Sequence, residues 1–209
     1  MLLTPEQFFG FLAAAVLITV SPGPDNMMVL AFGVSRGRTR GIVFGLGCAL
    51  GCLSHTALAA LGVSALIAAS PMAFMGLKIV GGLYLVWLGI QALRSSGGMR
   101  MVEADPAENS LLRLFAKGLL ANAINPKVII FFLSFLPQFV LAERGSVGWQ
   151  TAQLGLLFTV QAAVLFASLG YFSGVVGQWL QRHAHVGNWL DRLAGTVFIA
   201  LGMRLLIVR

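Results

Sequence analysis

Charged residues are scarce in this chain: only 10% of its 209 residues are charged, whereas 58% are hydrophobic. Soluble globular domains contain about 25% charged residues. The composition therefore excludes an ordinary soluble domain and predicts a polytopic membrane protein embedded in the lipid bilayer. Acidic residues are scarcer than basic ones, with 7 Asp and Glu against 14 Lys and Arg.

The excess of basic residues does not indicate a nucleic-acid partner, because no basic stripe is interleaved with aromatic residues. The basic residues lie instead in short gaps between apolar runs, where Lys and Arg mark cytoplasmic loops. Most of them follow the first, third and fifth apolar segments. This distribution predicts that both chain termini lie outside the cell.

Basic residues are also missing before the first apolar run, so we expect no cleavable signal peptide. The residues there predict a helix start instead. Thr4 suits the N-cap, Pro5 suits the first helical position, and the Gln7 side chain can reach back to the cap.

Cysteine is limited to Cys48 and Cys52, which lie in one apolar segment. Two thiols without further ligands make a weak metal site, so we expect no metal ion and no cofactor. Small packing residues are the favoured interpretation. The same segment holds several glycines at four-residue spacings, which would suit close helix packing within the chain or in a homodimer.

Apolar segments long enough to cross about 30 Å of hydrocarbon cover residues 7–34, 42–69, 72–94, 112–141, 150–178 and 190–208. The last is the weakest, because charged residues interrupt it. A polar linker, residues 95–111, divides the chain and is expected in the cytoplasm. It separates a first three-helix repeat, residues 1–94, from a second, residues 112–209.

The two halves correspond in their helix breaks. Ser21-Pro22 in the first segment corresponds to Asn125-Pro126 in the fourth. An odd number of crossings per repeat forces the halves into opposite orientations. We therefore predict an all-α integral membrane protein with six transmembrane helices, arranged as two inverted three-helix repeats in which helices one and four are broken.

These breaks carry the polar chemistry of the chain. Pro22, Gly23 and Pro24 interrupt the first segment halfway, and Pro126 interrupts the fourth. In lipid, a broken helix is tolerated only against protein or a wet cavity, because its freed carbonyl groups need partners. Paired central breaks are the best sequence indication of a transporter's binding site.

Two charges accompany the breaks. Asp25 is the only acid deep in an apolar segment, and Lys127 is the only comparably deep lysine. An isolated charge at the bilayer centre costs at least about 2.5 kcal/mol, so each needs a partner. We expect the two to share one cavity and attract each other, either as a structural pair or as a gate. The carboxylate is also a candidate for the coupling proton.

Other polar residues in apolar segments have two interpretations each. His55, the only histidine far from a loop, is a second proton-coupling candidate or a helix-packing residue. Gln161, midway along the fifth segment, either binds substrate or bridges helices.

Three motifs resemble the LysE/RhtB family of amino-acid exporters: "SPGPDN" at Ser21–Asn26, "LKIVGGLYLVWLGIQALR" at Leu77–Arg94 and "NAINPKVIIFFLSFLPQFV" at Asn122–Val140. The resemblance is greater to the homoserine/threonine branch. It implies a bacterial inner-membrane transporter, not an enzyme, that exports small neutral or hydroxylated amino acids, with protons as the coupled ion and alternating access. The residues carried over from the motifs are Ser21, Pro22, Gly23, Pro24, Asp25, Asn122, Asn125, Pro126 and Lys127.

The predicted substrate site combines the two breaks: Ser21, Gly23, Asp25, Asn26, Asn122, Asn125, Lys127 and Gln161. An amino acid is a zwitterion. Its ammonium group suits Asp25 and exposed carbonyl groups, and its carboxylate suits Lys127 and the N-terminus of a half-helix.

Two alternatives start from the same segments. A heavy-metal exporter of the same superfamily would use the deep carboxylate, histidine and thiols, but Lys127 would repel its cation. A membrane thiol-redox protein would need cysteines on equivalent helices, whereas both thiols lie in one segment.

Overall fold

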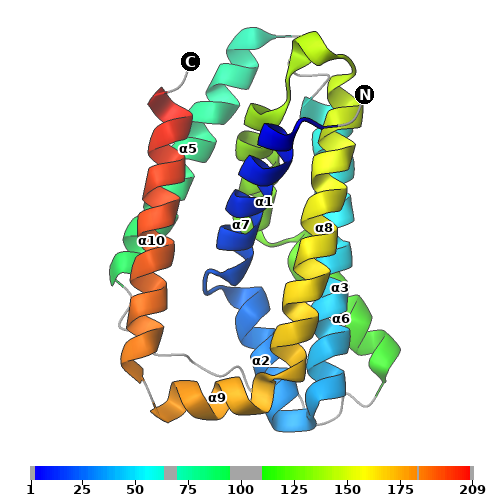
Figure 1. Ribbon diagram of the computed structural model, residues 1–209, viewed down its shortest axis with the longest axis vertical. Helices are drawn as coiled ribbons and strands as arrows, with labels where there is room; N and C mark the ends of the chain where they lie inside the picture. The colour runs from blue at the N-terminus through cyan, green and yellow to red at the C-terminus, as the bar shows by residue number, and fades with distance from the viewer. Residues whose placement is uncertain (1–2, 64–69, 95–109, 183, 208–209) are drawn as a thin grey trace.

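The computed structural model describes residues 3–63, 70–94, 110–182 and 184–207. Within these ranges every regular element is helical, and most helices run along the long axis of the molecule (Figure 1). The predicted linker, residues 95–111, lies outside the described residues except for its last two positions.

Three helices are each long and apolar enough to cross a membrane: α3 (Arg38–Leu58) with its π-helical continuation, α5 (Pro71–Arg94) and α8 (Val147–Tyr171). The π-helical turn that prolongs α3 spans Ala59–Val63. These helices agree with the second, third and fifth predicted segments.

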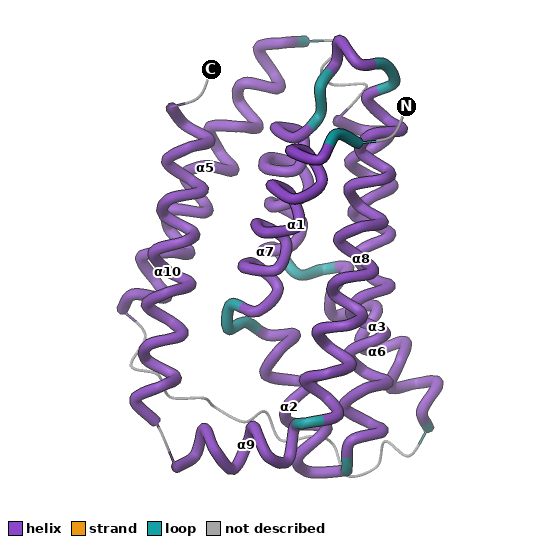
Figure 2. The backbone as a smooth tube through the Cα atoms, viewed as in Figure 1, coloured by secondary structure: helices purple, strands orange, loops and turns teal. Residues whose placement is uncertain are grey.

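Two further candidate spans are bent helix pairs, as the proline breaks predict. In the first, α1 (Pro5–Val20) and α2 (Pro24–Arg36) meet at 57°. In the second, α6 (Leu111–Ala123) meets at 50° the helix that begins with α7 (Pro126–Ile130) and continues as π- and 3₁₀-helical turns to Phe139. Figure 2 shows both breaks as short loops about halfway along the molecule.

The sixth predicted segment lies in α10 (Ala184–Ile207), a helix of 24 residues that begins before the predicted start at residue 190. By length and hydropathy, the described residues contain 3 candidate spans, or up to 5 when each bent pair counts as one span. Helix α10 is not among them. Asp191, Arg192 and Arg204 interrupt its apolar character. The six-span count predicted from the sequence is therefore not reached by these criteria.

The fifth predicted segment ends earlier than residue 178. Helix α8 stops at Tyr171, and the chain turns into α9 (Ser173–Arg182), which lies across the end of the molecule (Figure 1). A short apolar stretch after Phe172 thus belongs to a separate helix that packs against α2 and not to the span.

The predicted start of α1 is confirmed by its cap. Thr4 Oγ1 accepts a hydrogen bond from the Gln7 backbone N–H at 3.1 Å, and the Thr4 N–H donates to Gln7 Oε1 at 2.9 Å. Pro5 occupies the first turn, where its missing N–H has no intrahelical partner to lose.

Helices α5 and α10 pack against each other in antiparallel orientation through glycines. A Cβ atom on Gly89 would lie 2.6 Å from the Gly195 carbonyl oxygen, and one on Gly202 would lie 2.6 Å from that of Gly82. Any side chain at these positions would push the backbones apart. Close approach of the two helices therefore requires glycine here.

The predicted glycine face of α3 is used within the chain. Gly41 lies against Gly33 of α2 and Gly170 of α8, and Gly45 lies against Phe166 of α8. Gly47 and Gly51 lie against the backbone of α6. This face therefore packs inside the chain and is not available to a second copy.

Phenylalanine rings fill the core between the breaks and the end where α1 begins. Phe158 of α8 stacks near Phe11 of α1 and near Phe131 and Phe132, with ring centroids 4.9 to 6.5 Å apart. All four rings are buried. We call Phe11, Phe131, Phe132 and Phe158 the phenylalanine cluster.

Candidate functional site

At the first helix break, polar side chains donate hydrogen bonds to the carbonyl groups that have lost their backbone partners. Where α1 ends, the Ser21 N–H still makes the last helical hydrogen bond, and the Ser21 hydroxyl, the Asn26 amide and the Lys127 ammonium group replace the missing backbone donors. The carbonyl oxygens that accept these hydrogen bonds belong to Leu17, Ile18, Thr19, Val20 and Ser21. The polar residues at this break thus meet the requirement that no backbone group is left unpaired in lipid.

Lys127 joins the second break to the first. Its Nζ donates to Ser21 Oγ at 2.7 Å and to the Ser21 carbonyl oxygen at 2.9 Å. The Asn125 side chain caps the same turn by accepting from the Lys127 backbone N–H at 3.1 Å. Lys127 Nζ also lies 5.5 Å from the ring centroid of Phe198 on α10.

Asp25 makes the reciprocal contact. Asn122 Nδ2, at the end of α6, donates to Asp25 Oδ2 at 2.8 Å. On its other side, the Asn122 carbonyl oxygen lies 3.0 Å from His55 Nε2, and because a carbonyl only accepts, Nε2 carries the hydrogen. His55 Nδ1 is buried and has no partner among the described residues.

Asp25 and Lys127 border the same cavity but do not form a direct ion pair in the described part of the chain. Each bonds instead to the opposite break: the carboxylate to Asn122, and the ammonium group to Ser21. Asp25 is 5% exposed, so its charge is shielded from solvent by these neutral partners.

Both breaks line one small cavity of about 20 Å³, which we call the polar cavity. Six of the eight predicted substrate residues border it: Gly23, Asp25, Asn26, Asn122, Asn125 and Lys127. Ser21 is not among the lining residues but contacts Lys127 directly.

Gln161 does not line the polar cavity. Its Nε2 donates to Thr19 Oγ1 at 2.9 Å, so it bridges α8 to α1, the second of its two predicted roles. Its Oε1 is buried without a partner among the described residues.

Thr19, Phe158 and Phe166 border the polar cavity without having been predicted. Each lies in an apolar helical stretch where the same residue types normally serve packing, so composition does not distinguish them. The position of Thr19 two residues before Ser21 is the one available signal.

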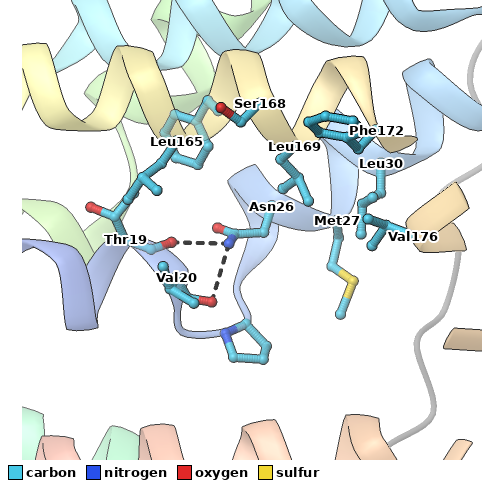
Figure 3. A pocket seen from close by; sticks show the side chains of 12 residues that line it. Thr19, Val20, Asn26, Met27, Leu30, Leu165, Ser168, Leu169, Phe172 and Val176 are labelled. Carbon is cyan, nitrogen blue, oxygen red and sulfur yellow. Dashed lines mark hydrogen bonds between the residues drawn. The ribbon is translucent and has the colours of Figure 1, made fainter. Parts of the chain in front are cut away.

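A larger cavity adjoins the polar one, at about 330 Å³ (Figure 3). It lies between the α1–α2 break and helices α8 and α9, and its lining is mostly aliphatic and aromatic. Thr19, Asn26 and Phe166 border both cavities. We call this second space the apolar cavity.

The cysteines lie apart from any metal-binding geometry. Cys48 and Cys52 are buried on α3 as free thiols, and Cys52 Sγ lies 3.4 Å from Asn122 Oδ1. Among the described residues, no group of three or more His, Cys, Asp or Glu side chains is placed to hold a metal ion.

Long apolar helices and two bent spans, whose breaks meet at a buried carboxylate and a partly buried lysine, define a multi-pass membrane protein with a central polar site. The chain belongs to the LysE type translocator family, which matches residues 16–209. The resemblance drawn from the three motifs is thereby confirmed.

Individual relatives agree with this assignment. An uncharacterized membrane protein of Pseudomonas aeruginosa is 33% identical over 204 residues, covering 95% of this chain and 94% of the relative. The threonine efflux protein of Escherichia coli K12 is 32% identical over 202 residues, covering 93% and 94%. The homoserine/homoserine lactone efflux protein of Salmonella typhimurium is 27% identical over 207 residues, covering 99% of both chains. No solved structure matches the chain.

Proposed function

We propose that this protein exports small neutral or hydroxylated amino acids from the bacterial cytoplasm across the inner membrane. The similarity to threonine and homoserine efflux proteins supports the substrate class. One structural observation carries the proposal: the two helix breaks bring a carboxylate and an ammonium group to one buried cavity. Both ends of a zwitterion therefore find a complementary charge.

The substrate binds by replacing the contacts that now hold the two charges. Its ammonium group takes the place of the Asn122 amide on Asp25, and its carboxylate takes the place of Ser21 on Lys127. Each present contact joins a charged group to a neutral one, whereas the exchange joins each charged group to a group of opposite charge. Asn26 and Asn125 hold the break geometry around the substrate.

Proton entry drives export in this proposal. Asp25 is the primary proton carrier, because it faces the cavity and loses its charge on protonation. His55 is the second candidate, because Asn122 lies between its ring and the Asp25 carboxylate. A proton and a substrate ammonium group would compete for Asp25, which is the requirement for antiport.

Alternating access requires the polar cavity to open to one side at a time. The phenylalanine cluster lies between this cavity and the end where α1 begins, whereas the apolar cavity extends the site on the other side. We infer that this conformation is closed toward the outside, with both termini outside as the basic loops predict. The antiparallel packing of α5 against α10 supports six crossings in two inverted repeats.

Purified protein in liposomes preloaded with labelled L-threonine, L-homoserine or L-alanine tests the proposal. We expect efflux to accelerate when the outside is made acidic, and a protonophore to abolish the acceleration. Lys127→Met should reduce efflux at least tenfold, whereas Lys117→Met, the same change at an exposed position of α6, should not. Efflux no faster than from protein-free liposomes for all three amino acids would refute the function.

A further inference from the structure

The polar cavity is too small for an amino acid. Its volume of about 20 Å³ is close to the space that a single water molecule needs, about 10–15 Å³ on the same measure. A substrate whose charged groups reach Asp25 and Lys127 must therefore place its side chain elsewhere. This step rests on the proposed export of amino acids.

The apolar cavity is the adjoining space. It shares Thr19, Asn26 and Phe166 with the polar cavity, and its volume of about 330 Å³ falls in the range of small-molecule sites, about 300–1,000 Å³. Asn26 stands at the junction, where its Nδ2 is held by the Thr19 carbonyl oxygen at 2.9 Å (Figure 3).

Polar side chains are few in the lining of the apolar cavity: Thr19, Asn26 and Ser168. The Ser168 hydroxyl donates to the Val164 carbonyl oxygen at 2.7 Å, and Thr19 Oγ1 accepts from Gln161. The remaining wall is formed by side chains such as Val20, Met27, Leu30, Leu169, Phe172 and Val176. A substrate hydroxyl group placed against this wall would lose its hydrogen bonds to water without finding new partners there. An apolar side chain would instead be stabilised by the burial of its surface.

We propose that the apolar cavity is the side-chain subsite of the transporter and selects neutral amino acids with aliphatic or aromatic side chains of four or more carbons. Small and hydroxylated substrates enter the same site but leave the subsite underfilled. Each buried methylene group strengthens binding about fourfold. Leucine should therefore be exported at least ten times more efficiently than alanine at equal low concentration.

Helix α9 offers a matched pair of variants. Val176 lines the apolar cavity, whereas its neighbour Val175 does not line it and is 71% exposed. Val176→Phe adds a ring to the cavity, and Val175→Phe adds the same ring to the exposed side. In preloaded liposomes, Val176→Phe should lower leucine efflux at least tenfold and alanine efflux less than threefold, whereas Val175→Phe should change neither.

A second variant tests the same subsite in the opposite direction and serves if Val176→Phe does not fold. Phe172→Ala enlarges the cavity and should raise phenylalanine efflux relative to leucine. The inference is overturned if the wild-type protein exports threonine and alanine but not leucine, or if Val176→Phe lowers leucine and alanine efflux equally. The proposed function itself fails only if the wild-type protein exports none of threonine, homoserine and alanine.

Discussion

At the scale of single residues, neither charge of the site is bonded directly to the other. Asp25 accepts a hydrogen bond from the Asn122 amide, and Lys127 donates one to Ser21, so each charged group is bonded to a neutral group of the opposite break. Removing one partner of a tightly bonded buried ion pair leaves the other uncompensated, whereas these neutral contacts can be replaced by a substrate at lower cost. The arrangement therefore suits a site whose charges must change partners.

Asp25→Asn tests this interpretation without a change of shape. The amide oxygen can still accept from Asn122 Nδ2, so we expect an unchanged melting temperature in detergent. The variant cannot take up a proton, so efflux driven by a pH gradient should fall at least tenfold in liposomes. Asp191→Asn, the same change on α10, is the control and should transport normally.

Two outcomes of this experiment would contradict the proposed role. Efflux from Asp25→Asn with an unaltered response to the pH gradient would remove the carboxylate from proton coupling. Recovery of full transport by combining Asp25→Asn with Lys127→Met would make the two charges a structural pair. Since they share no direct contact, we expect the double variant to transport no better than Lys127→Met alone.

At the scale of helices, glycines allow close contact in three helix pairs. Those of α3 bring it against α6 and α8, and those of α5 and α10 bring these two helices together. Without water to drive association, helices in membranes depend on close packing, so small residues determine which helices meet. The α5–α10 pair therefore depends on four glycines: Gly82, Gly89, Gly195 and Gly202.

Gly89→Val should separate α5 from α10. A Cβ there would lie 2.6 Å from the Gly195 carbonyl oxygen, and this backbone atom cannot rotate away. We expect a loss of about 1–3 kcal/mol in stability, measured as a lower melting temperature in detergent. Gly76→Val on the same helix is the control, because a Cβ at Gly76 has no atom within 4 Å. Equal melting temperatures for the two variants would show that the glycine contact does not hold the pair.

At the scale of the whole molecule, the ends of the helical bundle differ. Helix α1 begins and α10 ends at one end, whereas the turn from α2 to α3 and the short helix α9 lie at the other (Figure 1). The second end carries the basic cluster Arg36, Arg38 and Arg40. From the positive-inside rule we predict that this end faces the cytoplasm.

Single cysteines at exposed positions of the two ends test the orientation. In a background with Cys48→Ser and Cys52→Ser, we compare Thr39→Cys, at the basic end, with Glu143→Cys, at the other. A membrane-impermeant maleimide applied to right-side-out vesicles should label position 143, and position 39 only after permeabilisation. The reverse pattern would invert the protein in the membrane and leave its fold unchanged.

The sequence by itself determined what depends on neighbouring residues along the chain. Proline removes a donor wherever it stands, so the breaks at Pro22, Pro24 and Pro126 were predictable. The Thr4–Gln7 cap depends only on a three-residue spacing and was predicted as well. The cost of a buried charge likewise identified Asp25 and Lys127 as residues of the central site.

Only the tertiary structure decided which groups meet across the chain. Asp25 bonds to Asn122 and Lys127 bonds to Ser21, and Gln161, which does not line the polar cavity, bonds to Thr19. The apolar cavity arises because α8 ends at Tyr171 and α9 turns across the bundle, which hydropathy alone did not separate. Such contacts depend on how helices distant in the sequence are placed in space, and residue spacing within one helix carries no information about that placement.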